Sequence, residues 1–170
     1  SDRFKIFEKY NFQVPRYTSY PPATQFREAQ ESDRAQAERW LENAPQNISL
    51  YIHVPFCARL CHYCGCNMRV VNTYQPVEDY LDALKGEIGL VRARLPQNTR
   101  ISHLHFGGGS PTIIKPQDFQ KLVEFLSDKF PFSSNMEIGV EADPRHLSEA
   151  KIAAYAQSGV VYWEVEEKPL

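Results

Sequence analysis

The stretch LYIHVPFCARLCHYCGCN, residues 50–67, sets four cysteines directly behind a short apolar run. The run, residues 48–54, is rich in β-branched side chains and has the length of a buried strand. The cysteines follow with the spacing C-x3-C-x2-C-x-C, and they are Cys57, Cys61, Cys64 and Cys66. The chain has no other cysteine, so these thiols cannot join distant loops as a disulfide framework does. Thiols clustered in this way indicate metal binding or redox chemistry in a reducing compartment.

The residues alone leave three kinds of site open: an iron–sulfur cluster, a zinc site and a thiol redox site. Thiolates on one loop can surround a metal centre, and they select zinc, copper(I) or iron–sulfur clusters. Structural zinc sites usually need a second cysteine pair or paired histidines. His53 and His62 lie close in sequence, so zinc remains an alternative to the favoured iron–sulfur cluster. Cys61 and Cys64 also form a C-x-x-C pair, the spacing of thiol redox motifs.

Downstream of the cysteines, strand and helix patterns alternate. An apolar stripe at helical spacing predicts a helix over residues 77–95, and a second strand follows at 101–106. Glycines 107–109 and Pro111 mark a turn, after which residues 116–130 again show a helical stripe. A third strand at 136–140 precedes a helix that Ser148 caps and Gly159 ends. Three β-α units in a row predict an α/β fold with a parallel sheet and helical crossovers.

Three segments are expected in the chain. Residues 1–46, rich in aromatics and proline with one helix near 32–42, are an N-terminal extension that packs on the β-α core. The core is 47–159, and 160–170 form an atypical tail.

Composition limits the classes of partner. With 19 basic and 21 acidic residues among 170, the chain has no strong positive field for nucleic acid. No apolar run approaches the length of a membrane-spanning helix, and the first residues lack a signal-peptide core. We therefore expect a cytoplasmic monomer without nucleic-acid or membrane partners.

The cysteine spacing, with the aromatic Tyr63 directly before the third cysteine, resembles the signature of the radical S-adenosylmethionine (AdoMet) superfamily. In that superfamily three cysteines hold three irons of a 4Fe–4S cluster, and AdoMet chelates the fourth iron. The resemblance implies that this chain begins a partial (β/α) barrel, with the site at the carboxyl ends of its strands.

Five stretches together resemble one family in this superfamily, the oxygen-independent coproporphyrinogen III oxidases. They are PRYTSYP (15–21), LYIHVPFC (50–57), CGCN (64–67), LHFGGGSPT (104–112) and EADP (141–144). A related haem-chaperone branch generally lacks the Gly-Cys after the third cysteine and the PRYTSYP-type extension. It is therefore the alternative, as is a non-catalytic zinc-binding module.

The resemblance implies roles for individual residues. Cys57, Cys61 and Cys64 would ligate the cluster, and Cys66 would be a nearby thiol that matters for activity without being a ligand. Tyr51 would contact cluster-bound AdoMet, and Tyr63 fills the aromatic position associated with AdoMet binding. The remaining members of the implied AdoMet site are Gly108, Gly109 and Ser110, which would line it, and Glu141, which would hydrogen-bond AdoMet.

The implied activity is an oxidative decarboxylation in haem biosynthesis. A 5′-deoxyadenosyl radical would abstract hydrogen from propionates of coproporphyrinogen III, and loss of CO2 would give the vinyl groups of protoporphyrinogen IX. The family holds two AdoMet molecules and takes electrons from a donor such as flavodoxin or ferredoxin.

After Gly159 the family continues with a strand of the type N-R-I/L-S-x-G-V-Q, whereas this chain reads VVYWEVEEKPL. We therefore expect a truncated, frameshifted or fragmentary chain that is inactive by itself.

Overall fold

The structure, a computed structural model, describes residues 9, 22–62 and 64–165. The PRYTSYP stretch (15–21) and Tyr63 lie outside these residues. The chain divides into two compact units, residues 1–36 and 37–170. Within the first, a short 3-10 helix, η1 (Ala23–Gln25), precedes α2 (Glu31–Glu42), which runs across the boundary. Arg27 pairs with Asp33 at 2.7 Å, and this partner lowers the pKa of Asp33 to about 2.

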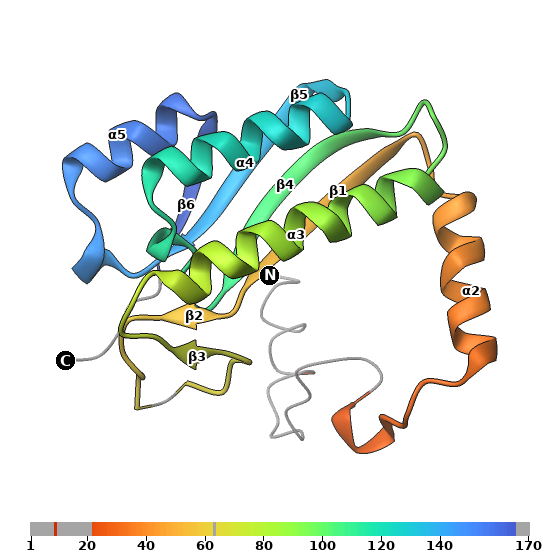
Figure 1. Cartoon of the computed structure of the whole chain (residues 1–170), viewed down its shortest axis with the longest axis horizontal. Helices are drawn as coiled ribbons and strands as arrows, with labels where there is room; N and C mark the ends of the chain where they lie inside the picture. The colour runs from red at the N-terminus through yellow and green to blue at the C-terminus, as the bar shows by residue number, and fades with distance from the viewer. Residues whose placement is uncertain (1–8, 10–21, 63, 166–170) are drawn as a thin grey trace. The chain divides into compact units, whose positions relative to one another are not determined.

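The second unit is built on a four-stranded parallel sheet in the order β1-β4-β5-β6 (Figure 1). Its strands are β1 (Asn47–Val54), β4 (Arg100–Gly108), β5 (Phe132–Ala142) and β6 (Val160–Val165). In the register, Tyr51 of β1 stands beside His105 of β4, and Glu141 of β5 stands beside Glu164 of β6. The predicted α/β class and parallel sheet are confirmed.

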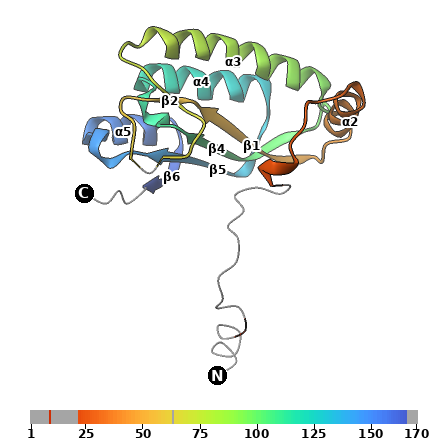
Figure 2. The same ribbon diagram turned by 90° about the horizontal axis from the view of Figure 1, so that it is seen from below.

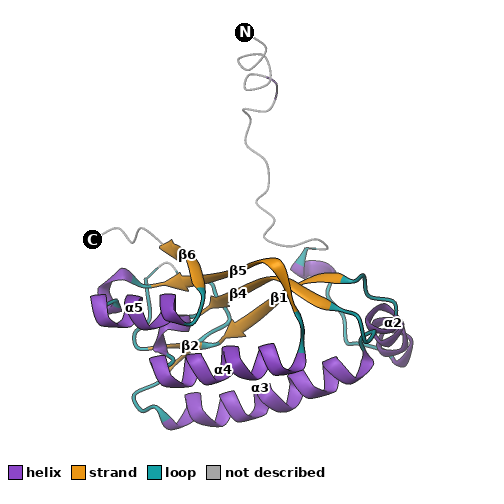
Figure 3. Cartoon of the chain, turned by 90° about the horizontal axis from the view of Figure 1, so that it is seen from above, coloured by secondary structure: helices purple, strands orange, loops and turns teal. Residues whose placement is uncertain are grey.

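The connecting helices are α3 (Gln75–Arg94), α4 (Pro116–Lys129) and α5 (Glu149–Gln157). They lie over one face of the sheet (Figures 2 and 3). Local sequence sets the ends of α5 as predicted. The Ser148 side chain accepts a hydrogen bond from the Lys151 amide, and Gly159 takes a φ of 96°, a conformation that glycine adopts without strain.

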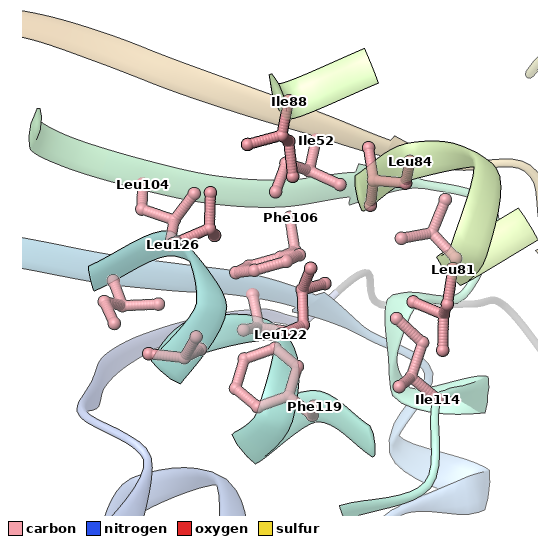
Figure 4. Close-up of a cluster of buried hydrophobic side chains, with 14 of the residues drawn as sticks. Ile52, Leu81, Leu84, Ile88, Leu104, Phe106, Ile114, Phe119, Leu122 and Leu126 are labelled. Atoms are coloured by element: carbon pink, nitrogen blue, oxygen red, sulfur yellow. The ribbon is translucent and has the colours of Figure 1, made fainter. Parts of the chain in front are cut away.

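The core fills the space between these helices and the sheet (Figure 4). Alternate strand residues point toward the helices, among them Ile52, Leu104 and Phe106, which are buried. Phe119 of α4 packs on Phe106 with ring centroids 4.8 Å apart and stacks on Tyr155 of α5 at 4.0 Å. Because one face is packed in this way, the other side chains of each strand are left for the opposite face.

The structure adds regular elements that the sequence patterns did not indicate. Residues 160–165, assigned to an atypical tail, form the parallel strand β6. Two very short strands, β2 (Phe56–Cys57) and β3 (Arg69–Val70), pair with each other around the cysteines. The remaining 3-10 turns are η2 (Pro111–Ile113) and η3 (Pro144–His146). None of the described helices has the length and apolarity that crossing a membrane requires.

Replacing Arg92 with methionine is expected to lower the free energy of unfolding by about 2 kcal/mol, measured by urea denaturation. The Arg92 guanidinium joins α3 to the segment that follows it and to the end of α4 by donating to four carbonyls, those of Leu95, Pro96, Gln97 and Lys129. Arg94→Met is the matched control, because Arg94 makes one backbone hydrogen bond and one exposed ion pair with Glu38. The control should change stability by less than about 0.5 kcal/mol. Equal effects of the two replacements would contradict this stabilising role of Arg92.

Candidate functional site

The cysteines lie on a loop that two short strands close. The Arg69 amide donates to the Pro55 carbonyl at 2.7 Å, and the Val71 amide donates to the Cys57 carbonyl at 3.0 Å. Within the loop, the Cys64 amide donates to the Cys61 carbonyl at 3.1 Å. All four cysteines are thiols: Cys57 is buried, Cys61 and Cys64 are half-buried, and Cys66 is exposed. The donors predicted from spacing therefore share one closed loop at the carboxyl end of β1.

The glycine run joins this loop to β4. The Gly109 amide donates to the Val54 carbonyl and the Ser110 amide to the Phe56 carbonyl, each at 2.8 Å. A Cβ on Gly109 would lie 2.6 Å from the Phe56 carbonyl oxygen and 2.9 Å from its amide nitrogen. A side chain does not fit here, because the obstacle is backbone. The turn therefore packs directly against the start of the cysteine loop.

His53 makes a second link to the loop. Its Nε2 lies 2.8 Å from the carbonyl oxygen of Asn67, which can only accept, so Nε2 carries the proton. In a neutral ring Nδ1 then accepts from the Tyr51 hydroxyl, at 3.2 Å. Gly108, with a φ of 110°, leaves the space that the ring occupies, since a Cβ there would lie 2.6 Å from His53. Strand β1 thus holds the distal end of the loop through one imidazole.

On the face of the sheet opposite the helices, polar side chains from neighbouring strands meet. Glu141 Oε2 accepts a hydrogen bond from the Gly108 amide at 2.9 Å, and Oε1 lies 3.4 Å from His105 Nε2. The Glu141 carboxylate and the Tyr51 ring fill the space above Gly107 that a Cβ would occupy. Partial burial and, to a smaller extent, the Glu141 charge raise the pKa of Tyr51. The Tyr51 phenol is therefore neutral at physiological pH and can donate a hydrogen bond.

His105 lies at the centre of this face. Its ring stacks on Tyr51 at 5.9 Å, and its Nδ1 lies 3.3 Å from the Tyr162 hydroxyl. In the part of the chain that the structure describes, His105, Glu141 and Glu164 form the one group of metal-ligating side chains with donor atoms within 4.8 Å of one another. Their own hydrogen-bond and charge contacts account for this proximity.

A charged pair follows β5. Arg145 donates to both oxygens of the buried Asp143 carboxylate, and its Nη2 lies 3.8 Å from the sulfur of Cys61. The Asp143 carboxylate raises the pKa of Arg145 above its usual value. A cation therefore stands beside one of the predicted cluster ligands.

The structure thus brings most of the predicted site residues to one edge. Tyr51, Gly108, Gly109, Ser110 and Glu141 lie where β1, β4 and β5 end, beside the cysteine loop. Tyr63 lies outside the described residues.

Sequence reasoning gave no role to His105 or Arg145 and considered His53 only as a zinc ligand. The strand alternation that puts His105 on the same face as Gly107 is the signal that could have found it.

Comparison with known proteins gives the class of protein. The family model of the radical SAM superfamily matches residues 51–165, and the chain belongs to that superfamily. Among curated relatives it is 43% identical over 152 residues to an oxygen-independent coproporphyrinogen III oxidase of Cereibacter sphaeroides, covering 89% of this chain and 33% of that one. It is 41% identical over 142 residues to the enzyme of that name from Salmonella typhimurium, covering 84% of this chain and 31% of that one.

A solved structure agrees. Coproporphyrinogen III oxidase from Escherichia coli, described as a radical SAM enzyme, matches with a TM-score of 0.77 and 33% identity, covering 95% of this chain and 35% of that one. The resemblance predicted from the sequence motifs is confirmed. The chain spans about a third of the length of the curated relatives that it matches.

Membership of this superfamily implies a 4Fe–4S cluster and AdoMet. The residues present fit such a group. Four thiols stand on one closed loop, and thiolates are the ligands that iron–sulfur clusters use. Beside the loop, glycines in place of larger residues let the backbone of 107–109 approach closely.

Proposed function

We propose that this chain supplies the cluster- and AdoMet-binding part of an oxygen-independent coproporphyrinogen III oxidase. The observation that carries the proposal is the direct hydrogen bonding of the glycine turn to the cysteine loop, with Glu141 bound to the same turn. The identities of 36–43% to oxidases of that name support the choice of this family within the superfamily.

In the proposed site three cysteines bind the cluster and Tyr51 binds AdoMet. Cys57, Cys61 and Cys64 hold the cluster, and Cys66, the most exposed thiol, is a neighbour that does not ligate it. Held at these cysteines, a cluster with AdoMet would supply the one-electron chemistry that removes hydrogen from a substrate propionate. Tyr51 contacts AdoMet with its ring and with its hydroxyl oxygen as an acceptor, because the hydroxyl proton is donated to His53 Nδ1.

The glycine turn and Glu141 form the rest of the proposed AdoMet site. Gly108, Gly109 and Ser110 line it with backbone rather than side chains. Glu141 accepts hydrogen bonds from AdoMet through lone pairs that its bond to the Gly108 amide leaves available. The complete enzyme would hold two AdoMet molecules, decarboxylate coproporphyrinogen III and take electrons from a flavodoxin or ferredoxin. Tyr63 is proposed as the aromatic contact of AdoMet.

Anaerobic reconstitution of the chain with iron and sulfide tests this function. We expect a brown protein that bleaches with dithionite, and we expect AdoMet to change the electron paramagnetic resonance spectrum of the reduced form. Glu141→Gln should weaken the AdoMet-dependent change while leaving the iron content unaltered, since Glu141 touches no cysteine in its described contacts. Binding of the substrate class is tested separately with coproporphyrin III, the oxidised and fluorescent form of the substrate.

A colourless protein that holds stoichiometric zinc after the same treatment would overturn the cluster assignment in favour of a zinc module. A brown protein that binds haem rather than coproporphyrin III would favour the haem-chaperone branch instead.

A further inference from the structure

Arg145 is held rigidly by a neighbouring carboxylate. Its Nε lies 2.9 Å from Asp143 Oδ1, and its Nη2 lies 2.6 Å from Oδ2, which is the two-pronged geometry that arginine forms with carboxylates. The Arg145 amide also donates to Asp143 Oδ1 at 3.1 Å. Pro144 stands between the two residues and restricts the backbone of the turn.

The two partners differ in exposure. The Asp143 side chain is 5% exposed, whereas that of Arg145 is 53% exposed. A buried carboxylate needs a charged or hydrogen-bonded partner, so Asp143 fixes the direction of the guanidinium. That direction brings Nη2 to 3.8 Å from the sulfur of Cys61, which lies 84 residues away in sequence.

We propose that the Asp143–Arg145 pair is a tuning device that raises the reduction potential of the cluster bound at Cys61. This proposal rests on the proposed function. A fixed positive charge beside a ligating sulfur favours the form of the cluster that carries one more negative charge. Hydrogen bonds and charges near the sulfurs are recognised determinants of such potentials. The step concerned is transfer of one electron from a reduced dye to the oxidised cluster, in which no bond forms or breaks.

The test is a dye-mediated redox titration of the reconstituted chain, with iron content measured on the same samples. Arg145→Met should lower the equilibrium constant for reduction of the cluster by about tenfold. This is the effect expected for the loss of one unit charge about 4 Å away in a partly aqueous environment. For a one-electron step this is a shift of about 59 mV to more negative potential. Arg145→Lys keeps the charge but loses the two-pronged bond, and should shift the potential by less.

Arg94→Met is the matched control, because it removes the same charge at a site away from the cysteine loop. Arg94 is the last residue of α3, near the amino-terminal end of β4. This control variant should leave the potential unchanged. Arg145→Met deprives the buried Asp143 of its guanidinium partner, so the single variant can unfold. The double variant Asp143→Asn/Arg145→Met removes both charges. Its potential can be compared with that of the parent if the single variant unfolds.

Equal potentials in the parent and the double variant, at equal iron content, would overturn the proposal while leaving the cluster assignment intact. Failure of the parent to take up iron would instead count against the proposed function.

Discussion

Serine in place of Cys57, Cys61 or Cys64, one at a time, is expected to abolish iron uptake and the brown colour after anaerobic reconstitution. A serine hydroxyl is far less acidic than a thiol, so it gives up its proton to iron much less readily. Each of the three sulfurs is proposed to bind a different iron, so the loss of one sulfur leaves one iron without its protein ligand. Cys66→Ser, on the same loop, should retain the cluster, because Cys66 is the most exposed of the four.

The measurement is iron per chain, with thermal unfolding of the unreconstituted variants as the control for folding. Cys57 is buried, so a hydroxyl there also costs stability, and Cys57→Ala separates this effect from the loss of a ligand. Uptake of zinc or iron that depends on Cys66 as strongly as on the others would indicate a four-cysteine site and contradict the assignment.

Alanine at Gly109 is expected to lower the free energy of unfolding by about 1–3 kcal/mol, the range for forcing extra atoms into a packed site. The added Cβ would meet the Phe56 backbone at 2.6 Å, and neither chain segment can turn aside as a side chain would. Relief requires the turn and the cysteine loop to separate, which would break the hydrogen bonds of Gly109 and Ser110. We therefore expect reduced iron uptake as well, measured beside urea denaturation.

Gly65→Ala is the matched control for that prediction. Gly65 lies within the cysteine loop itself, yet a Cβ there would meet no atom of the described residues within 4 Å, and its φ is not positive. It should therefore keep both stability and iron uptake close to those of the parent. If both alanine variants lose iron equally, packing of the glycine turn on the loop is not what supports the site.

The sequence predicted the regular part of the fold because that information is local. Helical stripes located α3 and α4, and Ser148 and Gly159 located the ends of α5. The family pattern does not indicate β6, because residues 160–165 depart from the strand that the family has at this position. Their β-branched and aromatic residues nevertheless suit a strand beside β5. β2 and β3 are two residues each, too short for any periodicity.

The site divides in the same way. Spacing alone identified the cysteine loop and the glycine turn as site segments, because the members of each group are close to one another in sequence. The contacts of His105 with Glu141 and of Arg145 with Cys61 join residues 36 and 84 positions apart, and no local pattern shows such neighbours. The residue types were visible in advance, but their partners depend on the register of the sheet.

The pairing of β2 with β3 has a consequence for how the metal group is acquired. The hydrogen bonds from Arg69 and Val71 close the cysteine loop through backbone groups and not through its sulfurs. Much of the conformational entropy of the loop is thus lost when the protein folds, rather than when the group is assembled. In classical zinc fingers, by contrast, metal binding and folding are one event. Loading here should therefore proceed on an already folded chain, and removing the metal with a chelator should be reversible without denaturation.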